Sequence, residues 1–125
     1  MFLEIDFESD IAIYEQIRRA FIVGLARGDL KKGDKLPSVR DLAEEIGINL
    51  HTVNKAYKLL ASDGFIVMDR RFGSMVGKDF EPVDDKEVNL IKDELAYLAS
   101  FAKLNGLSKE DFIAYIENIW EDKND

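Results

Sequence analysis

The chain has 125 residues, with 17 Lys and Arg against 25 Asp and Glu, one His, no Cys and a formal net charge of −8. This length allows one domain, or a small domain with an appendage, and excludes a large multidomain enzyme. Without Cys there are no disulfides or Cys-ligated zinc, and one His excludes two-His metal sites, so we expect no metal or cofactor. The sequence shows no long apolar run and no signal-peptide pattern, so we expect a cytoplasmic protein that does not enter the membrane.

The net negative charge of the whole chain argues against a nucleic-acid partner. However, the charged residues are not evenly distributed along the chain. Residues 1–78 hold 12 basic and 12 acidic side chains, whereas residues 79–125 hold 5 basic and 13 acidic ones. Residues 31–78 alone carry 9 basic and 6 acidic side chains, a local charge of +3. Such asymmetry suggests two modules with different partners.

The start of the chain predicts an arm followed by a helix. Weak alternation over Phe2–Phe7 predicts a short edge strand or an extended arm. Apolar residues then recur with helical spacing from about Ile13 to Arg27, and Gly28 is placed to end that helix.

Two shorter helices with a tight turn between them are predicted next. Ser38 is a good N-cap, Asp41 lies three residues on as in a capping box, and an apolar stripe runs to Gly47, which ends the first helix. After a three-residue turn, Asn49 can cap a second helix over about 50–62. The stripe of this second helix predicts a buried face formed by Val53, Ala56, Tyr57 and Leu60.

A β-hairpin is predicted to follow these helices. Residues 65–69 and 74–77 are short and β-prone, and Arg70–Gly73 between them is typical of a hairpin tip. Two short helices, a three-residue turn and a hairpin, in this order, predict a winged helix-turn-helix.

The outward face of the second helix carries side chains suited to DNA. Asn pairs bidentately with adenine, and Lys binds phosphate or guanine. Arg40 lies in the first turn of its helix, where a cation opposes the macrodipole, so a functional reason for it is expected. The candidates from this face and its flanks are Arg40, His51, Asn54, Lys55, Lys58, Arg70 and Arg71.

Four segments with specific order and spacing are Leu36-Pro37-Ser38-Val39-Arg40-Asp41-Leu42-Ala43, Gly47-Ile48-Asn49, Thr52-Val53-Asn54-Lys55-Ala56-Tyr57 and Leu60 with Gly64-Phe65-Ile66. Over about residues 10–78 the chain resembles the winged-helix domain of GntR-family transcription repressors. Its helical C-terminal part is similar to that of the YtrA subfamily, in which this region serves dimerisation. The resemblance implies a dimeric, operator-binding repressor.

The resemblance also implies which residues contact DNA. Carried over onto this sequence and joined with the outward helix face, the predicted DNA-binding residues are Ser38, Arg40, Asn49, His51, Thr52, Asn54, Lys55, Lys58, Arg70, Arg71 and Gly73. The chain departs from the family pattern at Leu50, where Pro or Arg is common, and at His51, where Asn or Thr is common. In the hairpin, Arg71 replaces a usual Gly and Phe72 a usual Lys.

Each candidate also has a purely structural interpretation. Arg40 could pair with Glu44 at i+4, and Thr52 could only support the helix start. The Asn and Lys side chains could form an ordinary solvated helix face, and the two hairpin arginines could simply keep the tip soluble.

The C-terminal part predicts two amphipathic helices after an acidic linker over residues 80–85. They span about 85–105 and 108–121, with Gly106 between them. The long helix carries one seam with alternating spacings of three and four, and a second stripe at Leu90, Tyr97, Phe101 and Leu104. One partner helix cannot bury both, so we expect a symmetric homodimer through Val88, Ile91, Leu95, Leu98, Ala102, Phe112, Ile116, Ile119 and Trp120. The alternative is that the second stripe packs on the chain's own winged domain.

We therefore expect a mostly α fold with a small β wing: a winged helix-turn-helix domain over residues 1–78 and a helical dimerisation region over 79–125. The expected function is repression of transcription by a homodimer bound to a palindromic double-stranded operator. The alternative is a winged-helix protein-interaction module without DNA binding. An enzyme is not expected, because phosphate-loop, nucleophile–base and two-His patterns are missing. An unidentified small-molecule effector could bind an apolar cleft between the two regions, but the sequence does not decide this.

Overall fold

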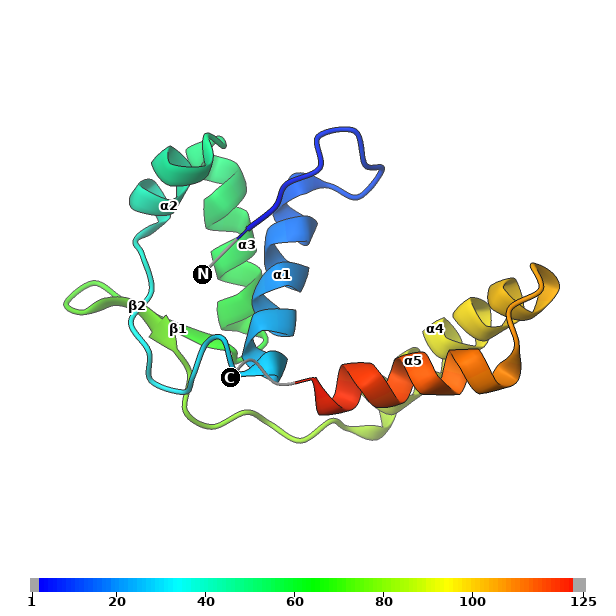
Figure 1. Cartoon of the computed structure of the whole chain (residues 1–125). Coiled ribbons are helices and arrows are strands. Elements are labelled where there is room, and N and C mark those ends of the chain that lie inside the picture. The colour runs from blue at the N-terminus through cyan, green and yellow to red at the C-terminus, as the bar shows by residue number, and fades with distance from the viewer. Residues whose placement is uncertain (1–2, 123–125) are drawn as a thin grey trace. The chain divides into compact units, whose positions relative to one another are not determined.

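The computed structural model describes residues 3–122, which form five helices and one two-stranded antiparallel sheet (Figure 1). They belong to two compact units, residues 3–80 and 81–122. No helix within residues 3–122 has the length and apolar character to cross a membrane. The elements are α1 Ile13–Arg27, α2 Val39–Ile46, α3 Leu50–Ser62, β1 Ile66–Asp69, β2 Gly73–Val76, α4 Asp85–Leu104 and α5 Lys109–Glu121. This architecture confirms the predicted winged helix-turn-helix followed by two helices.

The first unit has one apolar core, to which its three helices and both strands contribute. The predicted buried face of α3 is confirmed, because all four of its residues are fully buried. Burial of the large side chains gives the core about 1.5–3 kcal/mol each. The core members supplied by the rest of the unit are Ile17, Phe21, Leu30, Leu36, Leu42, Ala43, Ile66 and Val76.

The ends of α2 and α3 are fixed by their own flanking residues. The Ser38 hydroxyl accepts a hydrogen bond from the Asp41 N–H at 3.0 Å, and Asn49 Oδ1 accepts one from the His51 N–H at 2.8 Å. Gly47 ends α2 with φ +69°, in the left-handed region that glycine adopts without steric cost. The turn between the two helices is therefore specified locally, as predicted.

The wing is a hairpin whose inward face completes the core. Ile66 pairs with Val76 and both are buried, while the pairing of Asp69 with Gly73 closes a three-residue loop over 70–72. Gly73, the first residue after the loop, has φ +81°, a left-handed conformation that glycine adopts without steric cost. The hairpin tip projects from the body of the unit (Figure 1).

The N-terminal segment was predicted to form either a short edge strand or an extended arm, and it forms an arm. Residues 3–6 have no regular secondary structure, so the edge-strand prediction is wrong for them and the extended-arm prediction holds; Phe2 lies outside the described residues. The reason is the Gln16 side chain, which accepts from the Asp6 N–H and donates to the Asp6 carbonyl, both at 2.9 Å. It gives this backbone the partners that a neighbouring strand would otherwise provide, while Leu3 and Ile5 pack on the core.

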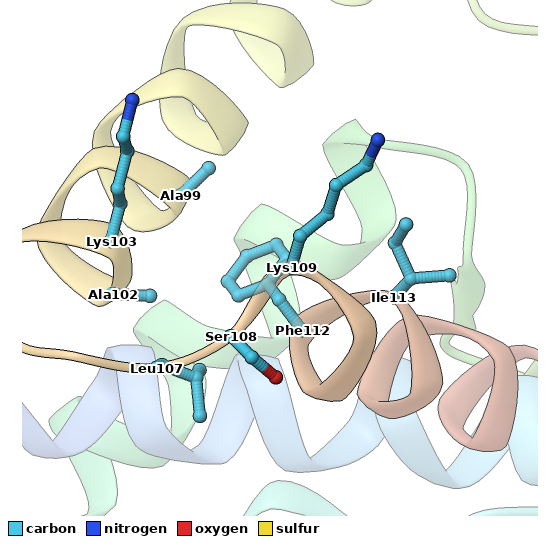
Figure 2. A pocket seen from close by; sticks show the side chains of 8 residues that line it. All are labelled: Ala99, Ala102, Lys103, Leu107, Ser108, Lys109, Phe112 and Ile113. Carbon is cyan, nitrogen blue, oxygen red and sulfur yellow. The ribbon is translucent and has the colours of Figure 1, made fainter.

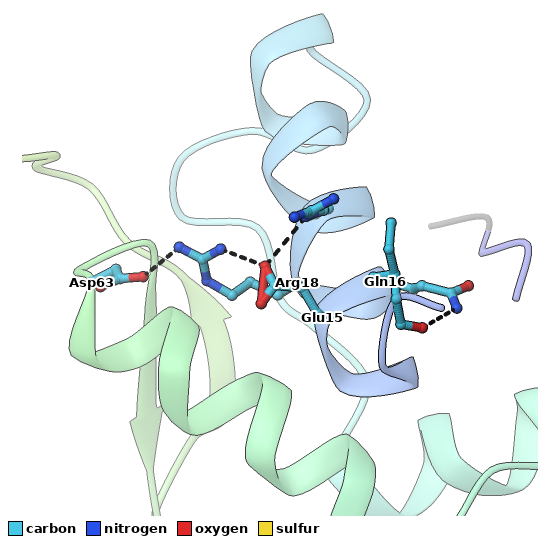
Figure 3. Close-up of polar contacts among 6 residues, drawn as sticks. Glu15, Gln16, Arg18 and Asp63 are labelled. Carbon is cyan, nitrogen blue, oxygen red and sulfur yellow. Dashed lines mark hydrogen bonds and ion pairs between the residues drawn. The ribbon is translucent and has the colours of Figure 1, made fainter. Parts of the chain in front are cut away.

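An arginine cluster joins α1 to the end of α3. The Arg18 guanidinium lies 2.8 Å from Glu15 Oε1 on its own helix and 3.0 Å from Asp63 Oδ2 (Figure 3). The Arg18 and Glu15 side chains are partly buried and the Asp63 side chain is exposed, so the bond to Asp63 is a surface ion pair of modest strength. The cluster supports α3 at the end opposite to the predicted DNA contacts.

The second unit is a helical hairpin with capped ends but no buried residue. Asp84 and Glu87 form a reciprocal capping box at the start of α4, and the Ser108 hydroxyl accepts from the Asp111 N–H at the start of α5. No residue of α4 or α5 is buried. Two helices of this length leave most of their apolar side chains in water.

Candidate nucleic-acid interface

Two hydrogen bonds hold α2, α3 and the wing in a fixed arrangement. The Tyr57 hydroxyl of α3 donates to the Pro37 carbonyl at 2.8 Å, directly before the N-cap of α2. The Leu36 N–H donates to the Ser74 carbonyl of β2 at 2.9 Å. The N-terminus of α2 is thus tied both to α3 and to the wing. The three elements predicted to contact DNA are therefore joined by hydrogen bonds within one compact unit.

Tyr57 is protonated throughout the physiological range. Its side chain is fully buried, and burial raises its pKa to about 12, with a smaller contribution from the negative charge of Glu45. The hydroxyl therefore keeps its proton and continues to donate to Pro37 under any condition in which the protein would work.

The N-terminus of α2 presents two of the predicted residues to solvent. Ser38 and Arg40 are both exposed. Ser38 uses an oxygen lone pair as the cap, so its O–H remains able to donate to an outside acceptor such as phosphate. Among residues 3–122, Arg40 makes no ion pair with Glu44, so the structural interpretation of Arg40 is not supported.

The first three turns of α3 carry the predicted polar residues. His51 and Lys58 are exposed, whereas Thr52 and Asn54 are half-buried. Asn49 holds the helix cap through its oxygen, which leaves its amide N–H groups available as donors.

Lys55 differs from its neighbours on α3. Its ammonium group lies 4.0 Å from the centre of the Tyr14 ring on α1, a cation–π contact. The side chain is therefore engaged with α1 in the absence of DNA.

The wing tip carries the remaining predicted residues. Arg70, Arg71 and Gly73 are all exposed. Asp69 Oδ1 accepts from the Arg71 N–H at 2.7 Å, and the Arg71 guanidinium lies 3.4 Å from Asp69 Oδ2. These bonds lower the pKa of the Asp69 carboxyl, first through the Arg71 backbone and then through its side chain. Arg70 has no ion pair within the described residues, so one arginine of the tip is tied to the hairpin and the other is not.

Sequence reasoning missed two apolar residues on this surface. Leu50, the first residue of α3, is 41% exposed and lines an open hollow with Arg40, Ala43 and Gly47. Phe72 at the wing tip is 57% exposed. In the sequence, both stand out only as departures from a family pattern. Their position beside predicted DNA contacts is the signal that could have identified them.

The second unit contains a cavity between α4 and α5. It has a volume of about 500 Å³, and its two lysines extend on the same side (Figure 2). The floor is apolar and includes small side chains from α4. The lining residues are Ala99, Ala102, Lys103, Leu107, Ser108, Lys109, Phe112 and Ile113.

The fold and this surface define a winged helix-turn-helix protein, a class in which the second helix of the pair lies in the DNA major groove. The family model described as "Bacterial regulatory proteins, gntR family" matches residues 12–76. The chain belongs to this family, whose members are helix-turn-helix transcriptional regulators rather than enzymes.

Named relatives are similar over both units. The transcriptional repressor YtrA of Bacillus subtilis is 36% identical over 121 residues, which cover 96% of this chain and 93% of the repressor. The structure of YtrA from Sulfolobus acidocaldarius has a TM-score of 0.64 at 39% identity and covers 78% of this chain and 99% of that one. A transcriptional antiterminator from Listeria monocytogenes has a TM-score of 0.86, covering 100% and 97%, but at 23% identity it shows similarity of fold alone.

Proposed function

We propose that this regulator is a repressor that binds a palindromic double-stranded DNA operator as a homodimer. The N-terminal half of α3 enters the major groove and the wing lies against the adjacent backbone and minor groove. The observation that carries the proposal is that hydrogen bonds join α2, α3 and the wing in one compact unit, in which the predicted residues are exposed or half-buried. A repressor of this kind acts on the chromosome, so we place it in the cytoplasm.

The chemistry of this surface matches the two parts of DNA recognition. Asn54 is a half-buried residue of α3, and an amide side chain there can pair with an adenine edge. Arg40, Lys58 and Arg70, on α2, α3 and the wing, are exposed cations suited to the phosphates. The acidic surplus of the chain lies in residues 79–125, and residues 31–78 carry a local +3. The total charge of −8 therefore does not describe the DNA-facing surface.

The homodimer is supported by the exposed apolar side chains of α4 and α5. The exposed members of the predicted interface are Ile91, Leu95, Leu98, Ile116, Ile119 and Trp120, while Val88, Ala102 and Phe112 are half-buried. Trp120 is 86% exposed. Each such side chain left in water forfeits about 1.5–3 kcal/mol. A second copy carries the same stripes and can bury them about a two-fold axis.

A mobility-shift titration with DNA selected from a random double-stranded pool tests operator binding. With six to eight phosphate contacts per dimer, affinity should fall about a thousandfold to ten-thousandfold between 50 and 200 mM salt. Arg40→Ala and Asn54→Ala should each weaken binding about tenfold or more. Arg19→Ala removes a charge from the exposed side of α1 and serves as the control. Salt-independent binding, or full affinity in both variants, would contradict the proposal.

Sedimentation equilibrium tests the homodimer. The full chain should sediment as a dimer, and Leu98→Asp, which places a charge in the predicted seam, should shift it to the monomer. Lys92→Ala changes another exposed α4 residue outside the predicted seam and should leave the dimer intact. A monomeric wild type would exclude the proposed symmetric complex.

For regulation, we propose that a small-molecule effector binds in the cavity between α4 and α5. The apolar floor and the two lysines suit a ligand with a short alkyl chain and an anionic group. A thermal-shift series with alkyl carboxylates of increasing length tests this on the full chain. Stabilisation that Lys103→Ala weakens would support the site, and the absence of any shift across the series would count against it.

A further inference from the structure

The wing tip carries a large aromatic side chain that the fold does not use. Phe72 is 57% exposed and is not among the residues that pack on the core. The hairpin buries Ile66 and Val76 instead, and its loop geometry depends on Gly73. A polar residue at position 72 would be compatible with the loop conformation and with exposure to water. A single exposed Phe is common on protein surfaces, so the argument depends on what surrounds it.

The ring of Phe72 lies beside the Arg71 guanidinium. The Arg71 guanidinium lies 5.0 Å from the ring centre, and the same guanidinium is bonded to Asp69. The Arg71 N–H is also fixed, by its 2.7 Å bond to Asp69 Oδ1. The chain of contacts from Asp69 through Arg71 to Phe72 restricts the tip before any partner arrives. Less conformational entropy is then lost when the ring inserts into a partner.

The charges at the tip identify the chemistry of that partner. Arg70 is exposed and without an ion pair among the described residues, and Arg71 stands beside the ring. An apolar ring flanked by cations fits a narrow polyanionic groove better than an apolar protein surface, where the unpaired guanidinium would have to be desolvated. The α2 N-terminus, which presents Ser38 and Arg40, is bonded to the same hairpin through the Leu36–Ser74 contact. The tip therefore belongs to the proposed DNA-facing surface.

We propose that Phe72 is a specificity-determining wedge, which enters the minor groove beside the wing and partly unstacks one base step. This inference rests on the proposed function, because it requires the wing to lie on operator DNA. Apolar wedges of this kind favour steps that kink easily, chiefly TA and CA/TG. The operator is then read at that step by deformability, without a hydrogen bond to a base. Arg70 places a positive charge near the phosphates or in the minor groove, and it does not discriminate between base-pair steps.

The experiment compares operators that differ only at the step under the wing. Fluorescence anisotropy gives the affinity of the full-length wild type for DNA carrying TA or GC at that step, and 2-aminopurine beside it reports unstacking. We expect about tenfold tighter binding to the TA operator and a rise in 2-aminopurine fluorescence. Phe72→Ala should still bind but should lose both signals, and Phe72→Trp should keep them. Arg70→Ala should weaken binding to both operators equally and retain the preference.

The outcomes separate this inference from the proposed function. If the wild type binds no selected DNA, the proposed function itself fails. If the wild type binds specifically and Phe72→Ala keeps the TA preference and the fluorescence change, the wedge is refuted while the repressor proposal stands. The variant is not expected to unfold, because Phe72 contributes nothing to the core; an unchanged circular dichroism melt confirms that lost discrimination is not lost folding.

Discussion

Replacing Tyr57 with Phe removes one buried hydroxyl and keeps the ring in the core. The change breaks the 2.8 Å hydrogen bond to the Pro37 carbonyl, which ties α3 to the start of α2. A hydrogen bond of this kind contributes about 0.5–1.5 kcal/mol net, and the carbonyl left behind loses its partner. We expect the free energy of unfolding near pH 7 to fall by about 1–2 kcal/mol.

The difference in free energy of unfolding between wild type and Tyr57→Phe should change with pH. This pH dependence tests the role of the hydroxyl more sharply than the size of the difference at pH 7. The pKa of Tyr57 is about 12 in the folded chain and about 10 when unfolded, so the unfolded state loses its proton first as pH rises. The stabilisation is fully present below pH 10 and is lost as pH rises through about 12, a decrease of roughly 3 kcal/mol. The variant has no phenolic proton to lose at this position, so the stability curves of the two proteins should cross near about pH 11.

Urea denaturation followed by circular dichroism at 222 nm, repeated from pH 7 to 12, measures both effects. The difference between wild type and variant cancels the other groups that titrate in this range. Tyr115→Phe makes the same chemical change at a 52% exposed position and serves as the matched control. Equal stability at pH 7, or curves that stay parallel up to pH 12, would refute the role given to this hydroxyl.

Three further predictions follow from local contacts. Ser38→Ala removes the N-cap of α2 and should lower unfolding stability by about 1 kcal/mol in a thermal melt, whereas Ser38→Asp, which can also cap, should restore it. Gln16→Ala should release the N-terminal arm and speed proteolysis within residues 3–11 without weakening DNA binding; unchanged proteolysis would contradict the clamp. The pKa of the Asp69 carboxyl, measured by NMR, should lie below its ordinary value, so its contribution to the hairpin is present near pH 4 and above and is lost as pH falls through that lowered pKa. Arg71→Ala should raise this pKa only partly, because the backbone bond remains, and a complete return would show that the side chain dominates.

Features that depend on neighbouring residues were predictable from the sequence. The caps at Ser38 and Asn49 are confirmed, as is the buried face of α3, because an N-cap and an apolar stripe act within one or two helical turns. The same holds for the hairpin, since Gly73 sets the loop conformation. These features were sufficient to predict the winged helix-turn-helix.

Features that join distant parts of the chain were not predictable. The Tyr57–Pro37 bond spans 20 residues, and the Lys55 contact with Tyr14 joins α3 to α1. Gln16 reaches back 10 residues to Asp6, and this segment forms an arm, one of the two alternatives that the sequence predicted. Such contacts depend on how helices pack, and side-chain periodicity does not report packing partners. The DNA contacts remain predictions, because they depend on the geometry of the operator as well as on the chain.

The central claim is that α2, α3 and the wing form a surface that recognises a particular DNA sequence. Selection of bound sites from a random double-stranded pool by the full-length protein, followed by sequencing, tests it most directly. The account predicts enrichment of an inverted repeat whose half-sites are about one helical turn apart, and loss of that enrichment in Asn54→Ala. Recovery of sequences with no common motif, or of the same motif with Asn54→Ala, would contradict the claim.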